Sequence, residues 1–216
     1  MQLYAGPLSL FSAKVRIVLD EKRIPYELIS VPFSRATGYQ PKHPLVVQVN
    51  PKQQVPVLMD GDLAVYDSTL INEYLEDRHP DPPLLPREPQ AKARCRQLEA
   101  AADEVLFPHV LALIYEVFYE PVGRPRDDER IAAARRAIAE QYAGLERTIG
   151  EGAYLCGDVT VADIGYFLTI TFASNLGAPL TDAEPRLKAW YERVFARPSV
   201  QREVQGLMAA AGNRES

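Results

Sequence analysis

The sequence has few of the residues that build metal centres and disulfide frameworks. Its 216 residues include only two cysteines and three histidines. Cys95 and Cys156 lie far apart and outside any CxxC motif, so we expect neither a zinc site nor a disulfide framework. We interpret both cysteines as buried, inert thiols, because burial is the usual environment of a free cysteine.

Long apolar runs and an excess of positive charge are also missing. No run approaches the ~18 residues of a membrane-spanning helix, so we expect no membrane association. The first residues have neither the basic nor the apolar region of a secretory signal, which predicts a cytoplasmic protein. A net charge of −5 argues against a general nucleic-acid binder. What remains is an ordinary globular composition, with 47% hydrophobic and 25% charged residues.

Proline divides the chain into two parts. Many of the 18 prolines cluster within residues 79–89. Proline fixes φ and has no N–H, so this segment is neither helix nor inner strand. We interpret residues 79–89 as a linker between a domain over residues 1–78 and a second domain over residues 90–216.

The first domain alternates short strand patterns with helical ones. Its elements follow the order β-α-β, then β-β-α, with a tight turn at Asp60-Gly61 joining the last two strands. We expect strands at residues 2–4, 26–31, 55–59 and 63–66, and helices near residues 11–19 and 67–78. This is the pattern of a small α/β domain.

The second domain is predicted to be all-helical. A 3–4 spacing of apolar residues runs through residues 98–117, where Pro108 should kink the helix. Thr160 and Asp163 have the spacing of a capping box, and the residues that follow are apolar all round, as in the central helix of a bundle. Further helices are expected near residues 131–149, 184–197 and from 198 onward.

The segment after the first strand is the first candidate site. Ser9 and Ser12 lie at a strand-to-helix junction, where free backbone N–H groups and the positive end of the helix dipole meet. Such a place stabilises an anion. For a serine considered alone, capping of the helix is the simpler interpretation.

Two further segments have similar alternatives. Pro56 lies at the start of a predicted strand. A cis peptide bond before it would turn the backbone groups of Val55 outward, where they could pair with an extended peptide. The simpler interpretation is an edge strand with a trans proline. Asp67 and Ser68 begin a helix, where they either hold the amino and carboxylate groups of a ligand or cap the helix.

Taken together, these segments resemble the cytosolic glutathione transferases over nearly the whole chain. The resemblance implies a thioredoxin-like N-terminal domain, a helical-bundle C-terminal domain, glutathione as cosubstrate and a homodimer. It rests on five motifs in order: Ser9-x-x-Ser12-x-Lys14-Val15-Arg16, Asn50-Pro51-x-x-Gln54-Val55-Pro56-Val57-Leu58, Asp67-Ser68-x-x-Ile71-x-Glu73-Tyr74-Leu75, Pro80-x-Pro82-Pro83-Leu84-Leu85-Pro86 and Gly157-Asp158-x-Thr160-x-Ala162-Asp163.

The resemblance also implies roles for individual residues. Ser9 matches the catalytic position that faces the glutathione sulfur, and Asp163 matches a residue with a folding role. For the other parts of glutathione, the resemblance implies that Val55 binds the cysteinyl backbone, with Pro56 cis. Asp67 and Ser68 would hold the γ-glutamyl end. Lys42 and Gln54 are weaker candidates for the glycyl end.

The implied chemistry is the activation of a thiol. A free thiol has a pKa near ~8.5, and donors from a serine hydroxyl and a helix N-terminus lower it. The thiolate then attacks an electrophilic carbon without a metal or a general base. Phe11, Tyr115 and Phe118 are candidates to line the electrophile's site, although aromatic residues at helical spacing are also typical of a core.

Several alternatives remain open. Tyr4 is near the position of the catalytic tyrosine of other classes, or it packs in the core. A serine at position 9 disfavours thiol–disulfide exchange, which needs a cysteine. Residues 50–86 also resemble the zeta class, which includes maleylacetoacetate isomerase, but its Ser-Ser-Cys motif is absent. Residues 26–31 and the linker resemble stringent starvation protein A, an RNA polymerase partner that does not use glutathione.

Overall fold

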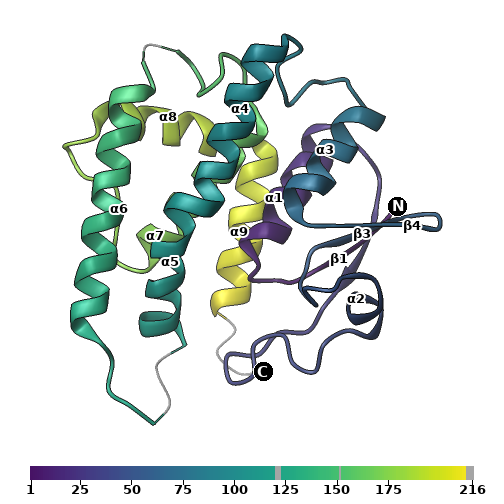
Figure 1. Ribbon diagram of the computed structural model, residues 1–216, viewed down its shortest axis with the longest axis horizontal. Helices are drawn as coiled ribbons and strands as arrows, with labels where there is room; N and C mark the ends of the chain where they lie inside the picture. Colours follow the sequence, from purple (N-terminus) through teal and green to yellow (C-terminus); the bar gives the residue numbers. More distant parts are fainter. Residues whose placement is uncertain (120–122, 151, 213–216) are drawn as a thin grey trace. The chain divides into compact units, whose positions relative to one another are not determined.

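The chain divides into two compact units (Figure 1). The computed structural model describes residues 1–119, 123–150 and 152–212. One unit comprises Met1–Leu84 together with the chain from Arg197 onward, and the other comprises Leu85–Ala196. Within the described ranges, no helix combines the length and the hydrophobicity that crossing a bilayer requires.

The first unit is built on a four-stranded mixed sheet. Its strands follow the order β2-β1-β3-β4, in which β1 is parallel to β2 and antiparallel to β3, and β3 and β4 form a hairpin. This confirms the predicted thioredoxin-like arrangement. The strands are β1 (Gln2–Ala5), β2 (Glu27–Ser30), β3 (Val57–Asp60) and β4 (Leu63–Tyr66).

Three helices flank this sheet: α1 (Leu10–Glu21), α2 (Pro44–Val49) and α3 (Ser68–Arg78). Figure 1 shows α1 and α3 on one side and α2 on the other. On the α2 side, Tyr4 packs with Val31, Val46 and Val57. The helix α2 was not predicted, because six residues are too few to show the repeating apolar spacing of a helix.

A last helix, α9 (Pro198–Gly212), belongs to the first unit, whereas the sequence analysis grouped it with the helical domain. The helix packs on the first unit through ion pairs as well as apolar contacts, because residues near the end of the chain carry charges complementary to those on α1. Side chains at the start of α9 and just before it pair with α1 in three ion pairs: Arg16–Glu203, Glu21–Arg197 and Asp20–Arg202.

The second unit is helical, as predicted. Its long first helix is not uniform, because two π-helical segments interrupt it. Pro108 lies in the first turn of α5, and in a regular α-helix its ring would clash with the carbonyl of Glu104; the wide turn before it avoids that clash. The segments in order are α4 (Pro89–Ala101), η1 (Ala102–Leu106), α5 (Phe107–Leu113), η2 (Ile114–Phe118), α6 (Asp128–Thr148), α7 (Val161–Asn175) and α8 (Pro185–Phe195).

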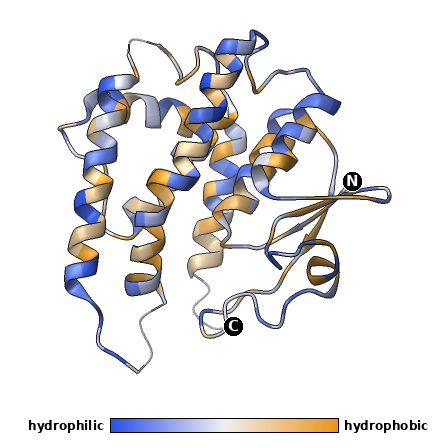
Figure 2. Ribbon diagram, viewed as in Figure 1, coloured by the Kyte–Doolittle hydropathy of each residue, from blue (hydrophilic) through white to orange (hydrophobic). Residues whose placement is uncertain are grey.

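The helices α6 and α7 show two kinds of sequence pattern. In Figure 2 the colour of α6 alternates along its length, as expected for a helix with one apolar face. Nearly all of α7 is buried, which confirms the predicted central helix. The predicted capping box is also present: Asp163 Oδ2 accepts from the Thr160 N–H at 2.8 Å, and α7 begins there.

Candidate functional site

The loop between β1 and α1 positions Ser9. Ser9 has the extended backbone of an N-cap, and its Oγ accepts from the N–H of Ser12 at 3.1 Å. Ser12 is fully buried, and its Oγ accepts from the N–H of Gly6 at 3.2 Å. From the sequence alone, either serine could cap the helix. The structure gives the cap to Ser9, because Ser12 already lies inside the helix.

Capping does not exhaust the hydrogen-bonding capacity of Ser9. The bond to Ser12 uses a lone pair of the hydroxyl oxygen, so the hydroxyl hydrogen can still be directed at an anion. Ser9 is also only half-buried. The first N–H groups of α1 and the helix dipole add to the positive potential at this point. Ser9 therefore combines a structural role with the geometry expected of an anion-stabilising group.

The fold braces this loop from two sides. The ring of Tyr39 packs directly on Gly6, where an added Cβ would come within 2.3 Å of it. Arg16 Nη1 donates to the Gly6 carbonyl at 3.2 Å, and Arg16 Nε donates to Glu203 Oε2 on α9 at 2.9 Å. Sequence reasoning missed Tyr39 and Glu203, since nothing in the sequence links them to residues 6–9. Arg16 stood in a matched motif, but without an assigned role.

Tyr4, the alternative catalytic residue, lies in the core. Its side chain is 9% exposed, and its ring meets the edge of the His43 ring with centroids 5.0 Å apart. This position agrees with the structural interpretation of Tyr4 rather than the catalytic one.

Asp67 begins α3 and is partly exposed. Its Oδ1 accepts from the N–H of Thr69 at 3.1 Å, and its Oδ2 accepts from Lys52 Nζ at 2.9 Å. The hydrogen bond and the charge of Asp67 raise the pKa of Lys52. Ser68, the next residue, is buried in the first turn of the helix. Lys52 was not predicted as part of this site, because it is remote from Asp67 in sequence.

The backbone of Asp67 is unusual. Its φ of +76° lies in a region that residues other than glycine rarely adopt. Such a conformation costs about 1–3 kcal/mol and is concentrated at functional sites, where the surrounding structure enforces it. It turns the chain from β4 into α3 and fixes the direction of the carboxylate.

The Val55–Pro56 peptide bond is cis, as the resemblance implied. The segment before it is held by Asn50, whose Nδ2 donates to the Gln54 carbonyl at 2.7 Å. The side chain of Gln54 is exposed, and Lys42 is half-buried before α2. Within the described part of the chain, no hydrogen bond or ion pair joins either side chain to the other candidates, so their roles stay predictions.

The strand register brings the three main candidate segments to one edge of the sheet. Tyr4 pairs with Val57, and Val57 pairs with Tyr66. Because β3 runs antiparallel to both neighbours, the chain leaves β1 and β4 at the same edge where it enters β3. The loop with Ser9, the Val55–Pro56 bond and the start of α3 at Asp67 therefore lie at this edge.

The aromatic candidates fall into different units. Phe11 is half-buried on α1, in the first unit, and Lys14 Nζ lies 5.9 Å from its ring centroid. In the second unit, Tyr115 is 52% exposed, and both Tyr115 and Phe118 contact Tyr119, with ring centroids 6.0 and 5.3 Å apart. The structure thus brings Tyr115 and Phe118 together, and a shared site with Phe11 stays a prediction.

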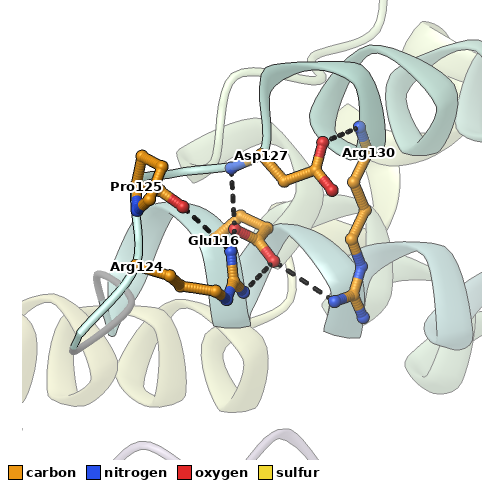
Figure 3. Close-up of polar contacts among 5 residues, drawn as sticks. All are labelled: Glu116, Arg124, Pro125, Asp127 and Arg130. Carbon is orange, nitrogen blue, oxygen red and sulfur yellow. Dashed lines mark hydrogen bonds and ion pairs between the residues drawn. The ribbon is translucent and has the colours of Figure 1, made fainter.

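A buried carboxylate anchors this aromatic segment (Figure 3). Glu116 is fully buried and accepts from Arg124 Nη2 at 2.6 Å, from Arg130 Nη1 at 3.2 Å and from the Asp127 N–H at 3.1 Å. These donors, Arg124 first among them, lower the pKa of Glu116 to about 2. Glu116 lies between Tyr115 and Phe118 in sequence, so its contacts tie their helical turn to the start of α6.

No group of three or more His, Cys, Asp or Glu side chains within the described ranges is placed to hold a metal ion. The polar groups at the sheet edge are instead hydroxyl, carboxylate and backbone groups. That set is suited to an organic ligand with charged ends.

Comparison with known proteins identifies the same two parts. Residues 3–83 match the N-terminal domain of glutathione S-transferases, and residues 110–198 match the C-terminal domain. A stringent starvation protein A homolog of Coxiella burnetii is 34% identical over 160 residues, covering 73% of this chain and 68% of that protein. Glutathione S-transferase 3 of Zea mays is 31% identical, covering 96% of this chain and 94% of that protein.

A solved structure adds a bound ligand to these comparisons. A glutathione S-transferase of Methylobacterium radiotolerans, in complex with glutathione sulfonate, is 32% identical with a TM-score of 0.75. The match covers 94% of this chain and 93% of that chain.

Proposed function

This chain belongs to the glutathione S-transferase family, and we propose that it transfers glutathione to a small electrophile, with Ser9 activating the thiol. The observation that carries the proposal is the meeting of Ser9, Val55–Pro56 and Asp67 at one edge of the sheet. The sequence resemblance assigns each of these three to a different part of glutathione: the sulfur, the cysteinyl backbone and the γ-glutamyl end.

Ser9 and the start of α1 supply the activation. The hydroxyl and the first free N–H groups donate to the sulfur and stabilise its anion, which lowers the thiol pKa. Each pKa unit corresponds to about 1.4 kcal/mol. The thiol proton passes to solvent, the sulfur forms a bond to the electrophilic carbon, and a leaving group departs or the adduct takes up a proton.

The remaining groups hold the tripeptide. The carboxylate of Asp67 binds the γ-glutamyl ammonium group, which takes the place that Lys52 Nζ occupies at 2.9 Å. Ser68 and the first N–H groups of α3 bind the neighbouring carboxylate. The backbone of Val55 pairs with the cysteinyl residue, and Lys42 and Gln54 contact the glycyl end. The glutathione sulfonate complex of the Methylobacterium relative supports a ligand of this class.

We further propose that aromatic side chains bind the electrophile. Tyr115 is exposed enough to contact a ligand, and Phe118 and Tyr119 extend the apolar surface around it. An aromatic or otherwise apolar electrophile fits this surface. Phe11 is the candidate contributed by the first unit.

A homodimer in the cytoplasm completes the proposal. The resemblance to the glutathione transferases implies a homodimer, and a two-fold interface is the commonest oligomeric arrangement. Light scattering at micromolar concentration should give twice the 24.1 kDa of one chain. A mass near that of one chain would exclude the dimer.

A second candidate function follows from the Coxiella relative, a stringent starvation protein A homolog. That reading makes the chain a non-catalytic partner of RNA polymerase. The groups at the sheet edge favour the enzyme, because an adaptor has no need of a thiol-activating Ser9 or of an Asp67 in a strained backbone conformation.

The two functions are separated by calorimetric titration with glutathione and by a pull-down against RNA polymerase. The transferase predicts saturable glutathione binding and glutathione-dependent turnover of at least one compound among halogenated aromatics, isothiocyanates, peroxides and maleylacetoacetate. Asp67→Asn is the matched variant, because it keeps a capping oxygen and removes the charge. Polymerase capture without glutathione binding would favour the adaptor.

A further inference from the structure

A buried ion pair joins the two helices that carry the proposed contacts to the sulfur and the γ-glutamyl end. Lys22 follows the last residue of α1, and Glu76 lies in the last turn of α3. Lys22 Nζ is 2.6 Å from Glu76 Oε2, and the Lys22 side chain is fully buried. The sequence analysis gave neither residue a role, because the two belong to separate helices.

The pair also holds the chain that follows α3. Lys22 Nζ donates to the carbonyl of His79 at 2.8 Å and to that of Pro82 at 2.9 Å. With Glu76, the three N–H donors of the ammonium group therefore have three acceptors. The N–H of Leu84 donates to Glu76 Oε2 at 3.0 Å. The beginning of the proline-rich segment is thus fixed to the first unit, although its sequence predicts a linker.

The helices α1 and α3 begin at the candidate site and meet the ion pair near their other ends. The chain leaves β1 and β4 at the same edge of the sheet, so both helices start there, and they pack against each other. At 1.5 Å per residue, the ion pair lies roughly 12–20 Å from the two starts. A fixed contact near one end of two packed helices determines where Ser9 and Asp67 lie relative to each other.

Net stability alone does not account for such an ion pair. Burial removes both charges from water, and well-packed apolar side chains of similar volume are often at least as stabilising. An apolar pair, however, tolerates some sliding of one helix along the other. An ammonium group with three acceptors is satisfied in one register only. The pair is therefore suited to fixing the register of α1 and α3.

We propose that Lys22 and Glu76 are positioning residues that hold Ser9 and Asp67 at the separation that glutathione requires. The inference rests on the proposed function, in which Ser9 contacts the sulfur and Asp67 the γ-glutamyl end. The pair does not touch the ligand and acts through the two helices. Without it the helix starts shift, and glutathione no longer meets both in its best geometry.

Glu76→Gln tests the proposal, because it keeps the shape and an acceptor oxygen and removes the charge that pairs with Lys22. We expect roughly three- to tenfold weaker glutathione binding by calorimetry. We also expect a higher pKa of the bound thiol in an ultraviolet titration, because the sulfur loses part of its contact with the start of α1.

Ile24→Ala is the matched control. Ile24 is buried in the turn after α1, at the same end of the helix as the ion pair, and its side chain is apolar. The substitution should lower the melting temperature and leave the affinity and the thiol pKa at their native values. It therefore separates a loss of stability from a loss of register.

The cysteines of the chain determine how the thiol titration is designed. The sequence predicts two buried thiols. Cys95 is buried, but that prediction is wrong for Cys156, which is only partly buried because it lies in the segment before α7. A partly exposed thiol also absorbs when it ionises. Each variant is therefore titrated with and without glutathione, and the difference gives the bound thiol.

A second measurement does not need glutathione. The N–H of Ser12 is bound by Ser9 Oγ, and the N–H of Thr69 is bound by Asp67 Oδ1. Amide hydrogen exchange at Ser12 and Thr69 therefore reports on the two helix starts. Exchange at both should be faster in Glu76→Gln than in Ile24→Ala.

If Glu76→Gln does not fold, the double variant Lys22→Met/Glu76→Gln provides the same test, because it leaves no unpaired buried charge and keeps an acceptor for Leu84. Native exchange at both amides, or a native thiol pKa in the variant, would overturn the proposal. A native chain that binds no glutathione would instead reject the proposed function. The exchange measurement would then still decide whether the ion pair positions the two helix starts.

Discussion

Asp67 and Asp163 each begin a helix, yet the two units use them differently. Asp67 caps α3 with one oxygen and holds only an exposed lysine with the other, and its side chain is 34% exposed. Asp163 begins α7 and is fully buried, and its oxygens accept from Thr160, Leu155 and the indole N–H of Trp190 at 2.8 Å. Burial raises the pKa of Asp163 in spite of these donors.

The comparison shows that accessibility decides whether a carboxylate at a helix N-terminus is free to change its partner. Both residues have the same type and a similar place at a helix N-terminus. In the proposed site, Asp67 exchanges Lys52 for the ammonium group of glutathione, and the ion pair that it gives up faces water. Asp163 has no such freedom, since every change of partner would leave a buried donor without an acceptor.

The largest effect is expected from Asp163→Ala. The substitution leaves two backbone N–H groups and the Trp190 indole N–H without their acceptor, at a cost of about 1–3 kcal/mol each. We expect the free energy of unfolding to fall by at least about 3 kcal/mol in urea titration. Asp158→Ala, at an exposed position in the preceding loop, is the control and should change it by less than about 0.5 kcal/mol.

If Asp163→Ala does not fold, Asp163→Asn provides the same test with a smaller loss, because one oxygen acceptor remains. If Asp158→Ala and Asp163→Ala had the same free energy of unfolding, Asp163 would not be a structural carboxylate. The distinction drawn between Asp67 and Asp163 would then be lost.

Asp67→Ala should act on binding more than on stability. Loss of a charge-assisted hydrogen bond costs about 1.5–3 kcal/mol, which corresponds to roughly 10–100-fold weaker glutathione binding by calorimetry. Loss of the cap costs about 0.5–2 kcal/mol of stability. Lys52→Ala is the matched control, because it removes the ion pair and keeps the carboxylate. A lower melting temperature with unchanged affinity would mean that Asp67 is only a cap.

Glu203→Ala should slow the reaction from a distance. Without Glu203, Arg16 loses the partner that holds it against the Gly6 carbonyl, and the loop before Ser9 loosens. A hydrogen bond of this kind is worth about 1 kcal/mol, so we expect roughly fivefold lower kcat and little change in KM for glutathione. Gln205→Ala, exposed on the same helix, is the control. Equal kcat values for the two variants would show that α9 does not position the loop.

Glu116→Gln should change the pH dependence of stability. The pKa of Glu116 falls from 4.5 to about 2 in the folded chain. Its contribution to stability is therefore complete above pH 4.5 and is lost as the pH falls toward 2, because the unfolded state binds the proton first. Chemical unfolding at several pH values should show a shallower acid loss for Glu116→Gln. Parallel curves for the variant and the native chain would contradict this assignment.

The sequence predicted the fold and much of the candidate site because both depend on local patterns. Alternating strands, the Asp60-Gly61 turn and the capping box of Thr160 and Asp163 each involve residues close together in the chain. Asp67 and Ser68 were found for the same reason, since they lie side by side at a helix start.

The residues that were missed make contacts between distant segments. Lys52 meets Asp67 across the start of β3, and Glu203 meets Arg16 from the far end of the chain. Neither pair has a periodic or motif signal. The division of roles between Ser9 and Ser12 was likewise decided by one turn of backbone geometry, which the spacing of two serines does not determine.

The central claim is that Ser9, the half-buried N-cap of α1, stabilises the glutathione thiolate. Its most direct test is the ultraviolet absorbance of the bound thiolate, titrated against pH in the native chain and in Ser9→Ala, Ser12→Ala and Tyr4→Phe. We predict that Ser9→Ala alone raises the pKa of the bound thiol, by about one unit, or 1.4 kcal/mol. A pKa that moves in Tyr4→Phe and stays fixed in Ser9→Ala would contradict the account.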